Sequence, residues 1–351
     1  MTDIKSPQQH IDINWYRVPI EKAVLRELNQ RSDRKGLAQA VGHLALLTLT
    51  GGLTIYSAGR GAASWILVPL LLLVHGAFYN FLLNGFHELC HGTVFASRKL
   101  NAFFLKVYSA LGFYNYIHFQ QSHRRHHRYT LHAPYDSEVL LPIQHTLKGF
   151  FLCGFVNFRY RFNLRGYVRH ARGIIVDPWQ QKLFPDSKPE LRQQLFGWAR
   201  FTLLLHGVIL LVSLILGVMM HPRWLLLPFV TTFARAFGQG LNFLLNETQH
   251  VGLSDNVPDF RLCARTILVN PFFGFLYWQM QYHIEHHMYA AVPFYNLPRL
   301  HRLIRHALPE PTRGIFATWR QIGDILAKQK VDPGFTYVPA LPHTDSAANR
   351  T

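Results

Sequence analysis

Two adjacent apolar stretches decide the fold: LAQAVGHLALLTLTGGLTIYSA at residues 37–58 and AASWILVPLLLLVHGAFYNFLLNGF at residues 62–86. Each contains the ~20 predominantly apolar residues that a helix needs to cross the hydrocarbon core of a membrane. Only Gly59, Arg60 and Gly61 separate the two stretches. We therefore expect a tight helical hairpin, which returns the chain to the side of the membrane from which it started.

A second pair of apolar stretches repeats this arrangement later in the chain. Phe201 to Met220 is followed by a turn at His221, Pro222 and Arg223, and then by Trp224 to Asn246. The sequence thus predicts an all-α integral membrane protein with four transmembrane helices in two hairpins.

The region between the hairpins contains two stretches of a different composition. Asn101 to Phe119 is apolar but rich in Tyr and Phe, and Lys148 to Arg172 interleaves aromatic residues with Arg. Both patterns are typical of helices that lie in the membrane interface, although the first stretch has a fifth transmembrane span as its alternative.

The remaining segments complete the predicted domain organisation. Residues 1–36 form a cytosolic amino-terminal arm, and residues 37–342 form a single membrane domain with a cytosolic helical cap. Residues 343–351 have the composition of a disordered tail.

Charge supports the membrane interpretation and sets the orientation. Charged residues make up 16% of the 351 residues, against ~25% in a soluble protein, yet the net charge is +17. Only Arg60 and Arg223 lie in the short turns and only Arg235 lies within an apolar stretch, so the other basic residues flank the membrane on one side. The positive-inside rule places that side in the cytosol. Membrane lipid then explains the charge, and no nucleic-acid partner is expected.

Histidines in short, regular spacings are the main chemical signal. The pattern H-x-x-H-H occurs twice, whereas chance predicts ~0.08 copies. The two copies are His123-Arg-Arg-His126-His127 and His283-Ile-Glu-His286-His287. His87-Glu-Leu-Cys-His91 follows the second apolar stretch, and Asn246-Glu-Thr-Gln-His250 ends the fourth.

This spacing predicts a site with two metals. Residues three and four apart share one face of a helix, and imidazole suits iron, copper, nickel or zinc. The predicted hairpins bring all four groups to the cytosolic face, and nine histidines exceed what one metal can bind. A structural zinc site closes with four ligands and a catalytic one usually uses three, so a pair of redox metals that handles dioxygen fits nine histidines better. The predicted ligands are His87, His91, His123, His126, His127, His250, His283, His286 and His287.

The order of these groups resembles the three histidine boxes of the membrane fatty acid desaturase and hydroxylase superfamily, H-x(3–4)-H, H-x(2–3)-H-H and H-x(2–3)-H-H. The resemblance extends from Leu37 to about Leu308. It implies two non-haem irons, dioxygen as cosubstrate and oxidation of a C–H bond. It also implies that His250 is an additional ligand and that Asn246 contacts a metal through water. The chain looks most like compact bacterial members, which include the branch of 1-alkene-forming fatty acid decarboxylases. This resemblance implies a bacterial inner membrane with the active site facing the cytoplasm.

Other polar residues near the boxes have two interpretations each. Glu88, Asp136, Glu247 and Glu285 either orient ligand rings through the second ring nitrogen or are ordinary solvated carboxylates. Arg235, inside an apolar stretch at a cost of ~2.5 kcal/mol or more, faces either helix carbonyls or an anion such as a fatty acid carboxylate. Arg124, Arg125 and Arg128 bind either a substrate carboxylate or lipid headgroups.

The resemblance implies a desaturase-type oxidation of a fatty acid or fatty acyl chain, with no catalytic residue beyond the metal site. Its alternatives are oxidative decarboxylation of a free fatty acid to a 1-alkene, and hydroxylation of a fatty acid or alkane. A histidine-rich metal transporter is the non-enzyme alternative, but it predicts a polar path through the bilayer that the apolar stretches lack. The sequence has no Gly-rich dinucleotide motif, iron–sulfur pattern or haem domain, so electrons must come from a ferredoxin or cytochrome with its reductase.

Overall fold

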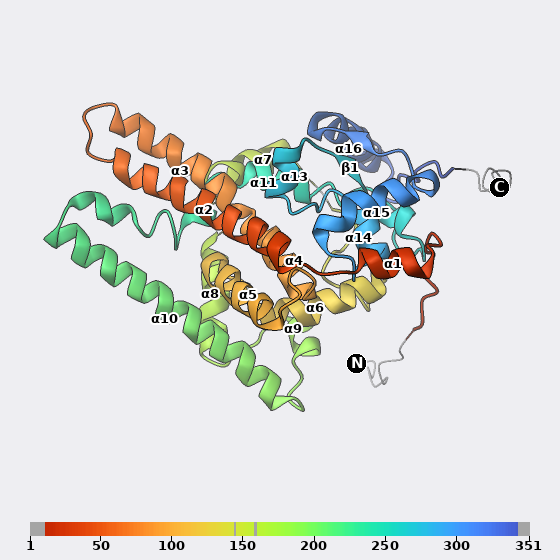
Figure 1. The fold of residues 1–351 in the computed structure, drawn as a ribbon, viewed down its shortest axis with the longest axis horizontal. Helices are drawn as coiled ribbons and strands as arrows, with labels where there is room; N and C mark the ends of the chain where they lie inside the picture. Colours follow the sequence, from red (N-terminus) through yellow and green to blue (C-terminus); the bar gives the residue numbers. More distant parts are fainter. Residues whose placement is uncertain (1–10, 144, 158–159, 343–351) are drawn as a thin grey trace.

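The computed structural model describes residues 11–143, 145–157 and 160–342, which are mostly helical (Figure 1). The predicted disordered tail, 343–351, and the first ten residues of the predicted arm lie outside the described residues.

Three helical segments in the described ranges are long and apolar enough to cross a membrane, which supports an integral membrane protein. The first is α2 (Asp33–Ser57), whose start is capped by Ser32, and the second joins α3 (Ser64–Asn80) to α4 (Leu82–His91). The third is α10 (Pro189–Met219). Helices α2 and α3 lie side by side in Figure 1, and Gly59 and Gly61, both with positive φ, make the turn between them.

The predicted fourth span differs from the structure, because residues 224–246 do not form one helix. They contain part of the 3₁₀ helix η1 (Pro222–Leu226), then η2 (Ala234–Ala236) and α11 (Gly240–Asn246). Pro228 has no amide hydrogen to donate within this segment, which disfavours a continuous helix. Gly238 has a φ of +60°, and a Cβ there would overlap the backbone of α3. The backbone at Gly238 therefore packs closely against α3, and the segment does not continue as one helix.

Buried histidines tie this interrupted segment to the long helices. Nε2 of His75 on α3 lies 2.9 Å from the carbonyl oxygen of Val230, and its Nδ1 lies 2.8 Å from the hydroxyl of Thr50 on α2. On α10, Nδ1 of His206 lies 2.9 Å from the hydroxyl of Thr232. These contacts satisfy polar groups that lipid would leave unpaired.

The two predicted interfacial stretches form pairs of short helices. The first contains α5 (Arg98–Gly112) and the start of α6 (Tyr116–Tyr129), separated at Phe113, where φ is +52°. At 15 residues, α5 is too short for a fifth span, and it packs against α4. The second contains α7 (Leu147–Gly154) and α8 (Tyr160–Ala171), and α8 packs along α10.

The carboxyl-terminal third folds into a helical cap next to α4 and α6 (Figure 1). Its core includes the fully buried Trp278 and Phe260. The amino-terminal arm packs on this cap, since the Trp15 ring stacks on that of Phe260 at 4.1 Å and Leu28 is fully buried. The remaining elements are α1 (Lys22–Leu28), α9 (Pro178–Leu183), α12 (Phe260–Cys263), β1 (Ile267–Leu268), α13 (Pro271–Leu276), α14 (His283–Met288), η3 (Phe294–Asn296), α15 (Leu297–Ile304), η4 (Arg305–Ala307), β2 (Thr312–Arg313) and α16 (Ile315–Val331), with β1 and β2 paired in parallel.

Candidate metal centre

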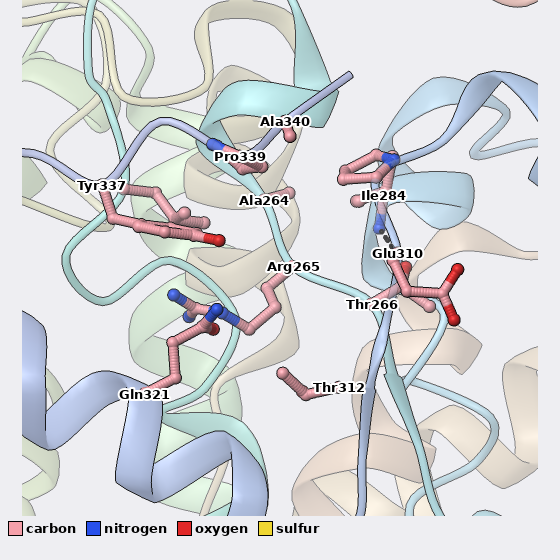
Figure 2. Close-up of a pocket in the computed structure, with 12 residues that line it drawn as sticks. Ala264, Arg265, Thr266, Ile284, Glu310, Thr312, Gln321, Tyr337, Pro339 and Ala340 are labelled. Carbon is pink, nitrogen blue, oxygen red and sulfur yellow. Dashed lines mark hydrogen bonds between the residues drawn. The ribbon is translucent and has the colours of Figure 1, made fainter. Parts of the chain in front are cut away.

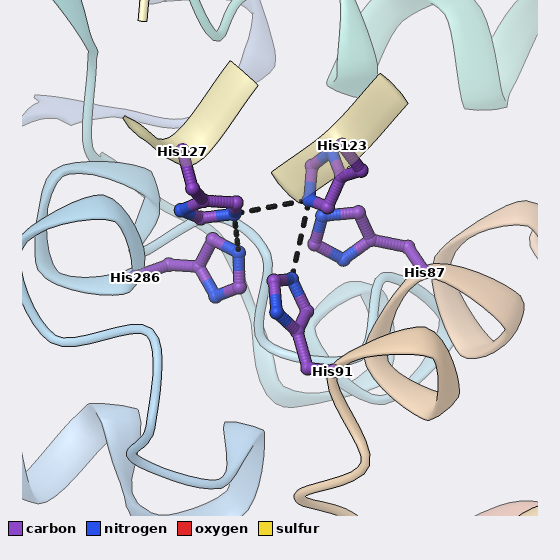
Figure 3. Close-up of side chains that lie close together, drawn as sticks. All are labelled: His87, His91, His123, His127 and His286. Atoms are coloured by element: carbon purple, nitrogen blue, oxygen red, sulfur yellow. Dashed lines mark hydrogen bonds between the residues drawn. The ribbon is translucent and has the colours of Figure 1, made fainter. Parts of the chain in front are cut away.

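The structure brings all nine predicted histidines together in two clusters. They come from α4, α6, α14 and the turn after α11, and all are buried except the half-buried His91 and His127. Within each cluster the candidate ligand nitrogens lie within 4.8 Å of one another. The first cluster, drawn in Figure 3, contains His87, His91, His123, His127 and His286. The second contains His126, His250, His283 and His287.

Helical geometry explains how the two H-x-x-H-H motifs divide between the clusters. His123 and His127, four apart on α6, both belong to the first cluster, and His126 belongs to the second. On α14 the division is reversed. His283 and His287 belong to the second cluster, and His286 belongs to the first. A step of about 100° per residue turns adjacent rings to different sides of the helix. Each motif therefore contributes to both clusters.

The ring nitrogens of the first cluster converge at short distances, as Figure 3 shows. Nε2 of His123 lies 3.2 Å from Nε2 of His91 and 3.0 Å from Nε2 of His127. Nε2 of His286 lies 3.2 Å from the Nε2 atom of His127.

The second cluster has the same spacing. Nε2 of His283 lies 2.9 Å from that of His250 and 3.1 Å from that of His287. Around a six-coordinate metal with bonds of about 2.1 Å, adjacent nitrogens lie about 3.0 Å apart. The distances between these Nε2 pairs therefore match those between adjacent ligands of one metal ion.

Neighbouring oxygens orient several of these rings through Nδ1. Oε1 of Glu138 lies 2.7 Å from Nδ1 of His123, and Oδ2 of Asp136 lies 2.8 Å from Nδ1 of His126. The carbonyl oxygen of Cys263 accepts a hydrogen bond from Nδ1 of His250 at 2.7 Å. Such contacts place the ring proton on Nδ1 and leave the Nε2 lone pair directed into the cluster.

The acidic residues singled out from the sequence fall into two groups. Glu88 and Asp136 contact cluster rings, with Oε1 of Glu88 3.2 Å from Nδ1 of His87. Glu285 instead accepts a hydrogen bond from Thr266 at 2.6 Å and contacts Nδ1 of His301.

Glu247, the fourth of these acids, also contacts a histidine outside the clusters, because its Oε2 lies 3.1 Å from Nε2 of His145. Glu138 was missed from the sequence. Its position two residues after Asp136, in the loop that follows the second box, was the available signal.

Burial keeps most cluster rings neutral, which is the form that binds a metal. Burial lowers the pKa of His250 to about 3 and lowers the pKa of His127, His283 and His287 well below the usual value. Burial also opposes the charged form of His126, but its hydrogen bond with Asp136 raises its pKa overall.

A cavity of about 210 Å³ opens onto both clusters. Its polar wall contains His87 and His123 of the first cluster and His126, His250 and His283 of the second. Its apolar wall contains Leu83, Phe119 and Met280. Asn246 also lines it, and its amide donates a hydrogen bond to the carbonyl oxygen of Asn242 at 3.0 Å.

The arginines singled out from the sequence lie in different surroundings. Arg235 donates a hydrogen bond to the carbonyl oxygen of Gly112 at 2.7 Å and lies over the ring of Tyr114 at 4.3 Å. It also lines a pocket of about 400 Å³ that shares two wall residues with the histidine cavity, Leu83 and Phe119.

The three arginines of α6 lie away from the cavity walls. Arg124 and Arg128 are exposed, and the guanidinium of Arg125 lies 5.6 Å from the ring centre of Trp179. None of the three lines the histidine cavity or the Arg235 pocket among the residues that the structure places.

A smaller pocket of about 120 Å³ adjoins α14 without containing any of the nine histidines (Figure 2). Ile284, between the histidines of that helix, lines it, and its backbone amide donates to the hydroxyl of Thr266 at 3.4 Å. Arg265 in the same pocket donates hydrogen bonds to the carbonyl oxygens of Thr248 and Val251. These hydrogen bonds hold Arg265 and Ile284 in place within the cap. Because none of the nine clustered histidines lines this pocket, the histidine cavity is the candidate site.

Comparison with known proteins agrees with this geometry. No curated protein matches the sequence. A family model described as fatty acid desaturase matches residues 63–319, which include all nine histidines of the two clusters. The family implies an oxidoreductase with a fatty acyl substrate in a lipid environment, and the clusters fit oxygen-dependent diiron chemistry. The chain therefore belongs to the fatty acid desaturase family.

Proposed function

We propose that this protein uses dioxygen and two non-haem irons to desaturate a fatty acid or fatty acyl chain. The observation that carries the proposal is the pair of histidine clusters whose Nε2 atoms converge beside one shared cavity. We assign this activity to a bacterial inner membrane, with the site facing the cytoplasm, from the distribution of basic residues and the resemblance to bacterial members.

The nine clustered histidines are the proposed iron ligands, five in the first cluster and four in the second. When bound, the irons supply the activation of dioxygen that breaks an unactivated C–H bond. The protein holds the rings in one tautomer through Asp136, Glu138 and the carbonyl of Cys263. Asn246, in the cavity wall, is the proposed contact through water.

The reaction needs electrons from a partner. Desaturation removes two hydrogens from adjacent carbons, and one dioxygen becomes two waters with two added electrons and two added protons. Because the chain has no motif for a redox cofactor of its own beyond the histidines, we propose a ferredoxin or cytochrome donor. The net charge of +17 favours a donor with an acidic surface.

The position of Arg235 favours oxidation within the chain over decarboxylation. Three aromatic rings connect its guanidinium to the first cluster: Tyr114 lies 4.7 Å from Phe86, Phe86 lies 4.9 Å from Phe119, and Phe119 lies 4.7 Å from His123, between ring centres. The Arg235 pocket contains none of the nine clustered histidines, so a carboxylate bound there would lie outside the histidine cavity. Decarboxylation to a 1-alkene instead requires the carboxylate close to the oxidised carbon.

Product analysis tests this choice. Cells that express the protein are fed one defined saturated fatty acid, and the products are separated by gas chromatography. An in-chain double bond is the expected result. A 1-alkene one carbon shorter would replace desaturation with oxidative decarboxylation, and an alcohol would replace it with hydroxylation.

A further inference from the structure

A row of three rings connects the protein surface to the second histidine cluster. Trp15, in the amino-terminal arm, is half-buried, and its ring stacks on that of Phe260 with the ring planes 6° apart and the centres 4.1 Å apart. Phe260 is buried, and its ring centre lies 5.4 Å from that of the cluster histidine His287. One aromatic ring thus separates the partly exposed indole from a proposed iron ligand.

A hydrogen bond connects the same indole to the backbone beside the first cluster. Nε1 of Trp15 donates to the carbonyl oxygen of Arg128 at 3.0 Å, and Arg128 directly follows His127 of the first cluster in the sequence. The indole also packs edge-on against the His132 ring, with the centres 5.3 Å apart. Trp15 therefore has a ring contact toward the second cluster and a hydrogen bond toward the first.

Backbone contacts hold the arm in this position. The amide of Tyr16 donates a hydrogen bond to the carbonyl oxygen of Pro258 at 2.9 Å. The amide of Val18 donates to the sulfur of Met288, at the end of α14, at 3.3 Å, and the Val18 side chain is buried. These contacts follow Trp15 directly along the chain, so they fix the arm against the cap beside the stacked rings.

The exposed charges on the two elements that carry these contacts are mostly positive. Arg124 and Arg128 are exposed one turn apart on α6, and Arg17 is exposed on the arm. Residues 11–20 contain one acid, the exposed Asp12. Such a surface favours a partner with an acidic surface, and tryptophan and arginine are the residues that most often dominate binding at protein interfaces.

We propose that a one-electron carrier protein with an acidic surface docks over Trp15 and that its electron passes through the Trp15 and Phe260 rings to the second cluster. The inference rests on the proposed function, which needs two added electrons per turnover. Each transfer oxidises one carrier by one electron and reduces one bound iron from Fe(III) to Fe(II), without forming or breaking a bond. Electron transfer through protein falls steeply with distance, so stacked rings in van der Waals contact favour this route.

The rate of reduction tests the route. Trp15→Leu removes the ring and keeps an apolar side chain, whereas Trp15→Phe keeps a ring. Trp179→Leu is the matched control, because that half-buried indole also donates a hydrogen bond to α6, to Oγ of Ser122 at 3.1 Å. Each iron-loaded protein is mixed without dioxygen with saturating reduced acidic ferredoxin, and separately with dithionite, a small reductant that needs no docking surface. The readout is the first-order rate of iron reduction.

The expected result separates electron transfer from a structural role of the indole. With ferredoxin, Trp15→Leu should lower the rate about tenfold, which corresponds to about 1.4 kcal/mol of activation free energy, and Trp15→Phe should lower it less. The rates with dithionite, and both rates of Trp179→Leu, should equal those of the wild type. An unchanged ferredoxin rate in Trp15→Leu, or an equal loss with dithionite, would overturn the proposal.

A binding measurement on the metal-free protein separates this proposal from the proposed function. Oxidised ferredoxin should quench tryptophan fluorescence on docking, and Trp15→Phe should lose part of that quenching, whereas Trp65→Phe, at the 84% exposed residue near the start of α3, should keep it. Quenching that depends on Trp15 in a protein that oxidises no fatty acid would support the docking surface and contradict the function. Fatty acid oxidation with equal quenching in Trp15→Phe would leave the function standing and overturn the proposal.

Discussion

His126 and His127 are adjacent in sequence, yet their rings belong to different histidine clusters. The same separation holds for the last two histidines of the third box, His286 and His287. The second and third boxes therefore each contribute rings to both clusters, whereas both histidines of the first box, His87 and His91, belong to the first cluster. This arrangement fixes the relative position of the two proposed irons.

Single substitutions in α6 should affect the two clusters differently. His126→Ala removes one of four nitrogen ligands from the second cluster, and His127→Ala removes one of five from the first. We expect the His126→Ala variant to lose more iron, because fewer ligands remain at its cluster. Iron analysis of the purified variants checks this, and equal loss of both irons in both variants would contradict the assignment of the two rings to different clusters.

The acids that contact Nδ1 should tune metal affinity. Asp136→Asn replaces the carboxylate beside His126 and should reduce iron affinity or activity about 10- to 100-fold. Glu285→Gln is the matched control, since that carboxylate contacts Thr266 and His301 rather than a cluster ring. Titration of metal-free protein with Fe(II) measures the difference, and a larger effect of the control would reverse the assignment.

Stability of the metal-free protein should fall in mild acid. The pKa of His250 is lowered from 6.5 to about 3 by burial, so below pH 6.5 the unfolded chain binds a proton that the folded protein does not. Folded stability is thus lost as the pH falls from about 6.5 toward 3. At pH 5.5 this one ring removes about 1.4 kcal/mol from the free energy of unfolding. Thermal unfolding at pH 7.5 and 5.5 checks the direction, and greater stability at pH 5.5 would contradict it.

Arg235 should bind the substrate carboxylate. Losing a charge-assisted hydrogen bond in Arg235→Gln should weaken binding of a free fatty acid about tenfold or more, with a smaller effect on its methyl ester. Arg223→Gln, in η1 after α10, is the control. Unchanged affinity and activity in folded Arg235→Gln would remove the carboxylate role and leave Arg235 as a support for Gly112.

The exposed arginines of α6 should contribute to docking of an acidic electron donor. Replacing both Arg124 and Arg128 with Gln should slow turnover with an acidic ferredoxin and reduce its dependence on salt. Arg60→Gln, in the turn between α2 and α3, is the control. Turnover and salt dependence equal to those of the wild type would remove this surface from the proposed interface.

Helical spacing made the histidine groups predictable, because residues three and four apart share a face. The assignment of each ring to one of two clusters was not predictable, since it depends on how α4, α6 and α14 pack. Glu138 and His301 were missed for the same reason, as both contact their partners through tertiary packing. Hydropathy predicted an unbroken helix over residues 224–246 because it measures composition, whereas Pro228 and Gly238 interrupt the backbone.

The most direct test of the central claim is the iron content and oxygen-dependent turnover of the purified protein. Reconstituted with Fe(II), a reducing system and one saturated fatty acid, it should bind two irons per chain and form an unsaturated product only when dioxygen is present. A protein that binds one metal or none, or that gives no oxidised fatty acid with two irons bound and electrons supplied, would contradict the account.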